Sequence, residues 1–317
     1  MNVLLIKLGA LGDMIMATPL IGQIQKHHEH EELWLLTTPM FYKLFENWSG
    51  LNVKTFNRKG IKSALQTVRW VRSSGFIRLY DLQSNDHTGI ICALSNVPER
   101  VGNHPRFPYN IHPFENYHGQ CHIYERMLEV LTNAGVKAQH SPPCLPVTDS
   151  VKAKVANWLT QYKIEDQKFI IIHAGASAKH PEKRWPYYQH LARTLVDSAY
   201  QIVWTGTKSD AELNAQLASV TGIDATDEFS IIELAELGRH ARCAITNDSG
   251  PMHVLSCSGI PVYAFFGPTN WRRNHAIGQS QNVIIADDQH IMKFRPVSLD
   301  RITPDLAINY LRAVALI

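Results

Sequence analysis

Two continuous apolar runs, each followed by a loop of small residues, constrain the fold of this chain most. Residues 2–6 lead into the loop 7–13, and residues 169–173 lead into the loop 174–179. A short run that is apolar at nearly every position is typical of a strand buried on both faces of a parallel sheet. A glycine-bearing loop and a helix after such a strand form the first half of a βαβ unit. The sequence therefore predicts two successive α/β halves.

The boundary between these halves is predicted from length and proline content. A chain of 317 residues suits two domains of about 150 residues each. The proline-rich stretch 141–146 is the strongest linker signal. We therefore expect Rossmann-like domains over 1–146 and 147–317, with parallel sheets that face each other across a cleft. The last helix is a candidate to pack back on the first domain.

The pattern of apolar residues and breakers predicts the remaining elements. Residues 100–121 lack periodicity and predict a long surface loop, a candidate lid over an acceptor site. Strands are expected at 33–37, 76–81, 201–205, 243–246 and 261–266, and helices at 14–25, 61–73, 89–93, 121–135, 151–162, 187–197, 211–220, 231–239 and from 304 onward.

Composition and cysteine usage narrow the class of protein. The net charge of +3 is too small to argue for a nucleic-acid partner. The five cysteines are odd in number and never spaced as CxxC, which predicts free thiols in a reducing compartment and no zinc site. No apolar run approaches the ~20 residues that span a bilayer, and the chain opens without a signal-peptide layout. We expect a cytoplasmic protein whose membrane contact, if any, is peripheral.

The stretch Asn247-Asp248-Ser249-Gly250 predicts an anion-binding loop. It follows a short apolar run and precedes residues 254–257, which have the character of a helix. Backbone N–H groups at a helix start, together with the helix dipole, suit a phosphate group. The alternative is that Asp248 or Ser249 only caps the helix.

Two further loops of the second half are expected at the same edge of the sheet. Lys179 or Lys183 could supply a positive charge to a diphosphate, although Lys183-Arg184 could also be a solvated pair. Asp210 or Glu212 could accept ribose hydroxyls or simply be first-turn helix carboxylates.

His253 follows Ser249 by four residues, so both side chains could face one site. The alternative is a structural role for His253.

Asp13 is the candidate catalytic residue of the first half. A carboxylate on a loop that faces the cleft could act as a general base, while the alternative is an N-cap of the helix that follows. The surrounding GxxGD pattern is not the GxGxxG dinucleotide fingerprint, which disfavours a dehydrogenase.

Four motifs follow one another along the chain: Lys7…Gly12-Asp13…Thr18-Pro19, Gly175-Ala176-Ser177…Lys183-Arg184-Trp185-Pro186, Asn247–His253 and Phe266-Gly267-Pro268-Thr269. In this order they resemble glycosyltransferase family 9, the ADP-heptose:lipopolysaccharide heptosyltransferases. The resemblance covers nearly the whole chain. It implies a GT-B fold with the donor in the C-terminal domain and the acceptor in the N-terminal domain.

The resemblance also implies the reaction and its partners. The expected reaction is an inverting, metal-independent transfer of heptose from ADP-heptose to a Kdo or heptose hydroxyl of the lipopolysaccharide inner core. It needs no cofactor beyond the nucleotide-sugar donor. The expected acceptor is the lipopolysaccharide core or lipid A–Kdo, met at the cytoplasmic face of the inner membrane. No Asp-x-Asp metal motif occurs in the chain.

The family's functional residues carry over by position. Asp13 would be the base, and Lys183 would neutralise the departing diphosphate. The family usually has Glu near the position of Asp210, which leaves Asp210 and Glu212 as alternatives for the nucleoside contact. The expected donor-binding residues are Gly175, Ser177, Asp210, Glu212, Asp248, Ser249, Gly250 and His253.

On the acceptor side, Arg100-Val101-Gly102 matches the family's Arg-Ile-Gly, and residues 81–85 resemble its acceptor loop. Basic residues between 58 and 78 suit an anionic acceptor at a membrane surface, or are a solvated helix face. The expected acceptor-binding residues are Gly12, Arg58, Lys59, Lys62, Gln83, Asn85 and Arg100.

Other functions remain open at this point. A GT-B transferase could use another nucleotide sugar or another acceptor. The same fold houses sugar-nucleotide epimerases, which would need further carboxylates in the cleft. A third alternative is a non-catalytic protein that binds a nucleotide sugar.

Overall fold

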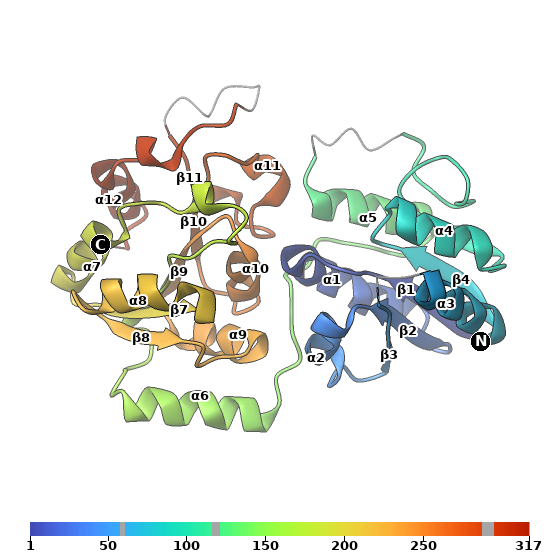
Figure 1. Ribbon diagram of the computed structural model, residues 1–317, viewed down its shortest axis with the longest axis horizontal. Helices are drawn as coiled ribbons and strands as arrows, with labels where there is room; N and C mark the ends of the chain where they lie inside the picture. The colour runs from blue at the N-terminus through green and yellow to red at the C-terminus, as the bar shows by residue number, and fades with distance from the viewer. Residues whose placement is uncertain (58–60, 116–120, 287–294, 317) are drawn as a thin grey trace. The chain divides into compact units, whose positions relative to one another are not determined.

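The computed structural model describes residues 1–57, 61–115, 121–286 and 295–316. The chain divides into two compact units, Met1–Pro146 and Val147–Ile317 (Figure 1). Each unit is a parallel β-sheet flanked by helices, which is the Rossmann-like architecture.

The first unit contains a five-stranded parallel sheet in the order β3-β2-β1-β4-β5. The central strand β1 is apolar from Val3 to Ile6, and all four of these residues are buried, as expected for a strand covered on both faces. The strands are β1 (Asn2–Ile6), β2 (Glu32–Thr37), β3 (Leu51–Thr55), β4 (Phe76–Asp81) and β5 (Glu99–Val101).

Helix pairs flank this sheet. Because side chains alternate along a strand, Leu4 and Ile6 point to one face, where they pack with Val71 of α3 and Ile91 of α4. Of the other helices in the first unit, α1 packs against α5. The helices are α1 (Leu11–His27), α2 (Tyr42–Phe45), α3 (Ile61–Ser73), α4 (Asp86–Leu94) and α5 (Ile123–Asn133), with a 3₁₀ turn η1 (Pro39–Phe41).

The second unit repeats the plan with a six-stranded parallel sheet in the order β11-β10-β9-β6-β7-β8. Its central strand β6 is buried at every position. The strands are β6 (Phe169–His173), β7 (Gln201–Gly206), β8 (Ile223–Thr226), β9 (Cys243–Asn247), β10 (Val262–Phe265) and β11 (Val283–Ile284).

Two apolar cores lie on opposite faces of this second sheet. Ile170 and Ile172 face a core formed with α7, α8 and α12. Phe169 and Ile171 face a core formed with α6, α9 and α10. The helices are α6 (Asp149–Gln161), α7 (Tyr188–Asp197), α8 (Ala211–Ala218), α9 (Ile231–His240), α10 (Gly250–Ser256), α11 (Trp271–Asn274) and α12 (Pro304–Ala313), with 3₁₀ turns η2 (Pro181–Lys183), η3 (Lys208–Asp210), η4 (Ser280–Asn282) and η6 (Leu299–Arg301).

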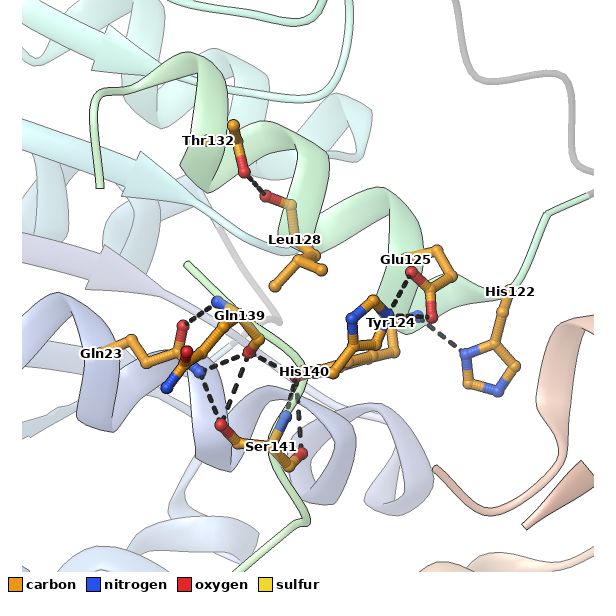
Figure 2. Close-up of polar contacts among 9 residues, drawn as sticks. All are labelled: Gln23, His122, Tyr124, Glu125, Leu128, Thr132, Gln139, His140 and Ser141. Carbon is orange, nitrogen blue, oxygen red and sulfur yellow. Dashed lines mark hydrogen bonds and ion pairs between the residues drawn. The ribbon is translucent and has the colours of Figure 1, made fainter. Parts of the chain in front are cut away.

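The segment before the unit boundary is held to helices of the first unit by side chains (Figure 2). The Gln23 amide of α1 donates to the Gln139 carbonyl at 2.8 Å and accepts from the Gln139 N–H at 2.8 Å. The Ser141 N–H donates to the Tyr124 hydroxyl of α5 at 3.1 Å. The chain is therefore anchored to α1 and α5 until shortly before it enters the second unit.

Most expected elements occur, with several differences. Strands β3, β5, β8 and β11 lie at sheet edges and are absent from the prediction, as are the short helices α2 and α11; β5 overlaps the start of the expected surface loop 100–121. Helix α10 begins at Gly250, earlier than expected, with Pro251 in its first turn. Helix α1 begins at Leu11, so Asp13 lies inside it. In the described ranges, no helix has both the length and the apolar character required to span a bilayer.

The packing of α12 yields a stability prediction. Leu311 is fully buried in the second unit's core, whereas Asn309 on the same helix is exposed. Leu311→Ala should lower the free energy of unfolding by about 3 kcal/mol, because it removes apolar contacts and leaves a cavity. Asn309→Ala is the control and should change it little. Denaturant unfolding followed by circular dichroism measures both, and equal effects would contradict this packing.

Candidate active site

The topology of each sheet marks one place for a ligand. In the second unit the chain runs outward from β6 to β7 and β8, then returns to β9 and runs outward to β10 and β11. In the first unit the corresponding reversal lies between β1 and β4. Ligands of open parallel sheets bind at the carboxyl ends of strands beside such a switch point. The predicted site residues follow these strands.

Asn247, the last residue of β9, fixes the loop that follows β6. Its buried amide Nδ2 donates to the carbonyls of Ala174 at 2.9 Å and Gly175 at 3.0 Å. Its Oδ1 accepts from the Trp185 N–H and the Tyr188 hydroxyl, both at 3.0 Å. Asn247 belongs to a motif seen in the sequence, but the motif alone does not indicate this role. Its position at a strand end, followed by Asp-Ser-Gly, was the available signal.

Lys183 is brought to Asp248 across the switch point. The Lys183 Nζ lies 2.7 Å from Asp248 Oδ2, and the side chains are 21% and 8% exposed. The Thr269 hydroxyl donates to the same carboxylate oxygen at 2.5 Å. Lys183 is therefore not a solvated side chain, and the Asp248 carboxylate does not cap α10. Thr269 is a second site residue that belongs to a sequence motif, Phe266-Gly267-Pro268-Thr269, without a role predicted from it.

Ser249 occupies the N-cap position of α10 without making a capping bond. Its hydroxyl is buried and has no hydrogen-bond partner among the described residues. Because a buried hydroxyl normally forms a hydrogen bond, this one is available to a ligand. Gly250 follows as the first residue of α10, and His253 is buried within that helix.

Asp210 is buried beneath the loop after β6. Its Oδ2 accepts from the Thr207 N–H at 3.0 Å, which closes the 3₁₀ turn after β7. A Cβ atom at Gly175 would lie 2.2 Å from Asp210 Oδ1, and one at Gly206 would lie 2.8 Å from Asp210 Cβ. Both glycines are therefore required by the close approach of this carboxylate. Asp210 Oδ1 makes no hydrogen bond within the described residues.

The surroundings of Asp210 include two cationic or basic groups. Arg184 Nη2 lies 4.0 Å from Asp210 Oδ1. Burial lowers the pKa of His173 at the end of β6; the Asp210 charge opposes this shift, and the Arg184 charge adds to it. Burial therefore favours the neutral form of His173 beside the buried Asp210 side chain.

The other predicted donor residues lie nearer the solvent. Glu212 is exposed in the first turn of α8, and Ser177 is exposed in the loop after β6. Beside Lys183 a pocket of about 470 Å³ is lined by Glu182, Arg184, Pro186, Pro268, Pro296, Val297, Ser298, Leu299 and Asp300.

In the first unit, Asp13 is the third residue of α1 rather than its N-cap. Its Oδ2 accepts from the Ala10 N–H at 3.3 Å, and the side chain is partly exposed. Gly12 precedes it in the same turn. Asp13 thus lies at the switch point between β1 and β4, with an orientation set by the start of the helix.

Lys7 connects the loop that follows β1 to the loop that follows β4 at this switch point. Its buried Nζ donates to the Leu82 carbonyl at 2.9 Å, and the neighbouring Leu8 N–H donates to Gln83 Oε1 at 2.9 Å. Burial lowers the pKa of Lys7, and the charges of Asp13 and Asp81 oppose this shift. Gln83 is therefore used to connect the β1 and β4 loops.

Asp81 is buried at the end of β4. Its Oδ1 accepts from the N–H groups of Gln83 and Ser84, and its Oδ2 accepts from the Tyr109 hydroxyl at 2.6 Å. Burial raises the pKa of Asp81, while these hydrogen bonds act in the opposite direction.

The remaining acceptor candidates differ in what the structure shows. Asn85 caps α4 by accepting from the Thr88 N–H at 3.0 Å. Arg100 donates to the carbonyls of Val97 and Pro108 and so holds a loop. Lys62 is exposed on α3, and Arg58 and Lys59 lie outside the described residues.

A pocket of the first unit is lined in part by Ala10, whose N–H donates to Asp13. It measures about 470 Å³ and lies at the carboxyl ends of β1 and β2. Gly9 lies in its wall with a φ of +115°, and a Cβ there would lie 2.5 Å from Phe41. The lining residues are Leu8, Gly9, Ala10, Thr38, Pro39, Met40, Phe41, Phe56 and Asn57.

Solved structures share this fold. A glycosyltransferase family 9 protein of Veillonella parvula superposes with a TM-score of 0.84 at 21% identity, covering 99% of this chain and 97% of the other. The ADP-heptose lps heptosyltransferase II of Escherichia coli superposes with a TM-score of 0.76 at 22% identity, covering 100% and 99%. At these identities the similarity defines the fold, which is of the GT-B class.

Sequence comparison defines the family. The profile of glycosyltransferase family 9 (heptosyltransferase) matches residues 112–301. Lipopolysaccharide heptosyltransferase 2 of Escherichia coli is 24% identical over 219 residues, which cover 63% of this chain and 62% of that protein. The chain belongs to glycosyltransferase family 9.

The hydrogen bonds of Asn247 yield a second stability prediction. Asn247→Ala would leave two carbonyls, one N–H and one hydroxyl without their buried partner, and we expect it to lower the free energy of unfolding by about 3 kcal/mol. Tyr188→Phe removes only one of these bonds and should cost about 1 kcal/mol. If thermal or denaturant unfolding gave equal values for both variants, the central role of Asn247 would be wrong.

His173 yields a prediction about pH. Its pKa is lowered in the fold, so the stability that its neutral form contributes is present above the ordinary value of about 6.5 and is lost as the pH falls toward the folded value. The free energy of unfolding should therefore decrease as the pH is lowered from about 6.5. His173→Gln should flatten this decrease, whereas the exposed-residue control His190→Gln should not. Denaturant unfolding between pH 5 and 8 measures the slopes.

Proposed function

We propose that this protein is an inverting, metal-independent glycosyltransferase that moves heptose from ADP-heptose to a Kdo or heptose hydroxyl of the lipopolysaccharide inner core. The observation that carries the proposal is the group formed by Lys183, Asp248, Thr269 and Ser249 at the switch point of the second sheet. Family membership favours a transferase over an epimerase or a non-catalytic binding protein.

The second unit would bind the nucleotide sugar. A Lys ammonium carries three N–H donors, so Lys183 can keep its bond to Asp248 and still donate to a diphosphate. The Ser249 hydroxyl, which has no hydrogen-bond partner in the described part of the chain, would donate to the same group. Because Thr269 and Lys183 already compensate the Asp248 charge, that carboxylate would repel the diphosphate less.

The first unit would supply the base. Asp13 would accept the proton from the acceptor hydroxyl as that oxygen attacks the anomeric carbon. The bond from the anomeric carbon to the diphosphate would break on the opposite side, which inverts the configuration. Lys183 would stabilise the negative charge that develops on the departing ADP, in the place that a metal ion takes in other transferases.

Relatives support the sugar and the acceptor. The similar Escherichia coli proteins are described as an ADP-heptose lps heptosyltransferase II and a lipopolysaccharide heptosyltransferase 2. We extend donor and acceptor to this chain on that basis. An acceptor carried by the inner membrane would place the enzyme at its cytoplasmic face as a peripheral protein.

Calorimetry with ADP, UDP and GDP tests the donor site. We expect the protein to bind ADP in preference to the other two nucleotides. Lys183→Ala should weaken ADP binding at least tenfold, because it removes a charge-assisted hydrogen bond. Lys179→Ala, an exposed lysine of the same loop, is the matched control and should leave the affinity unchanged. A preference for UDP or GDP would exclude the ADP-heptose assignment.

Asp13→Asn tests the base. Removal of a general base should lower kcat by about 100-fold to 10,000-fold. ADP affinity should stay unchanged, because Asp13 lies in the other unit. The release of ADP from ADP-heptose in the presence of acceptor measures the rate, and Asp86→Asn serves as the control. Full activity of Asp13→Asn would rule out its role as the base.

A further inference from the structure

The distribution of charge along this chain is strongly uneven. Residues 51–80 contain seven Lys or Arg and no Asp or Glu. The whole chain carries a net charge of +3, so the residues outside this stretch together carry −4. A protein whose positive charge is gathered in one segment can attract an anionic surface even when its net charge is small.

Helix α3 displays part of this charge along one stripe. Lys62, Leu65, Arg69 and Arg72 are all exposed. They lie at helical positions i, i+3, i+7 and i+10, which places them along a single side of the helix. With a rise of 1.5 Å per residue, the stripe is about 15 Å long. It contains an exposed leucine, 48% accessible, among three cations.

Helix α4 adds an apolar stripe beside it. Ile90 and Leu94 lie one turn apart and are 57% and 44% exposed. The two helices pack against each other, and Arg72 Nε donates to the Leu94 carbonyl at 2.7 Å, so their C-terminal ends meet (Figure 1). The anion on the α4 stripe, Asp86, lies at the opposite end of that helix.

We propose that this α3–α4 face, defined by Lys62, Leu65, Arg69, Arg72, Ile90 and Leu94, docks on an anionic lipid bilayer. Cations alone would suit any polyanion, but three exposed aliphatic side chains between and beside them favour a surface that offers both charge and hydrocarbon. Such a surface is the headgroup region of a membrane that contains acidic phospholipid. This docking proposal rests on the proposed function in one respect: the acceptor sugar would be carried by the membrane.

The sheet topology places the α3–α4 face close to the proposed acceptor site. Helix α4 starts directly after the loop 82–85 at the carboxyl end of β4, the strand end beside which Asp13 lies. Both helices run from the carboxyl ends of the strands back toward their amino ends, because each helix connects two parallel strands. A bilayer bound along α3 and α4 would lie next to the carboxyl ends of the strands, where a membrane-borne sugar must reach Asp13.

Vesicle sedimentation tests the proposal. The full chain is mixed with vesicles of phosphatidylcholine alone or with phosphatidylglycerol, without lipopolysaccharide. We expect binding to the anionic vesicles that weakens with salt. The double variant Arg69→Gln/Arg72→Gln should bind about 25-fold more weakly, since each cation near an anionic membrane contributes about 1 kcal/mol. Leu65→Ser/Ile90→Ser should also weaken binding.

The controls alter similar residues elsewhere. Lys168→Gln/Arg193→Gln removes two exposed cations of the second unit, and Val196→Ser removes an aliphatic side chain that is 40% exposed. Both should bind as the wild type does. The proposal is overturned if the wild type does not bind the anionic vesicles, or if the α3–α4 variants bind them as the wild type does. ADP calorimetry on the same samples reports separately on the proposed donor site.

Discussion

The arrangement of the second unit's site depends on one fully buried amide. The side chain of Asn247 is bonded to the loop after β6 at two carbonyls, and to the start of the α7 region at Trp185 and Tyr188. These bonds hold that whole connection over the end of β9. The same connection carries Lys183, whose Nζ donates to the carboxylate of Asp248, 65 positions away in the chain.

Patterns that depend on neighbouring residues allowed much of the fold to be predicted. The buried strands β1 and β6 have continuous apolar sequences, and α3 and β4 occur at the expected residues. All four edge strands were missed, because an edge strand needs only one partner and a partly buried face. Three of them have correspondingly polar sequences, LNVKT in β3, ERV in β5 and IDAT in β8, and β11 has only two residues. The start of α10 was missed although proline in a first turn is an established start signal.

The contacts of the candidate site could be predicted only in part. The motifs indicate which residues follow strand ends, and the structure brings Lys183, Asp248 and Ser249 to one switch point. Which oxygen meets which donor depends on the packing of separate loops, and no local pattern encodes it. Asp210 illustrates the limit: a first-turn acid suggests a solvent-facing ligand contact, yet close packing on Gly175 buries it.

The anchoring of residues 139–144 has a consequence for dissecting the protein. Besides the bonds from Gln23 and Tyr124, the Cys144 N–H donates to the Thr18 hydroxyl of α1 at 3.0 Å. The last stretch of the first unit is thus a part of its fold rather than a loose tether. A separately expressed N-terminal half that stopped at Gly135 would leave polar groups of α1 and α5 without partners. One that extends through Pro146 would retain them, together with the buried side chain of Leu145.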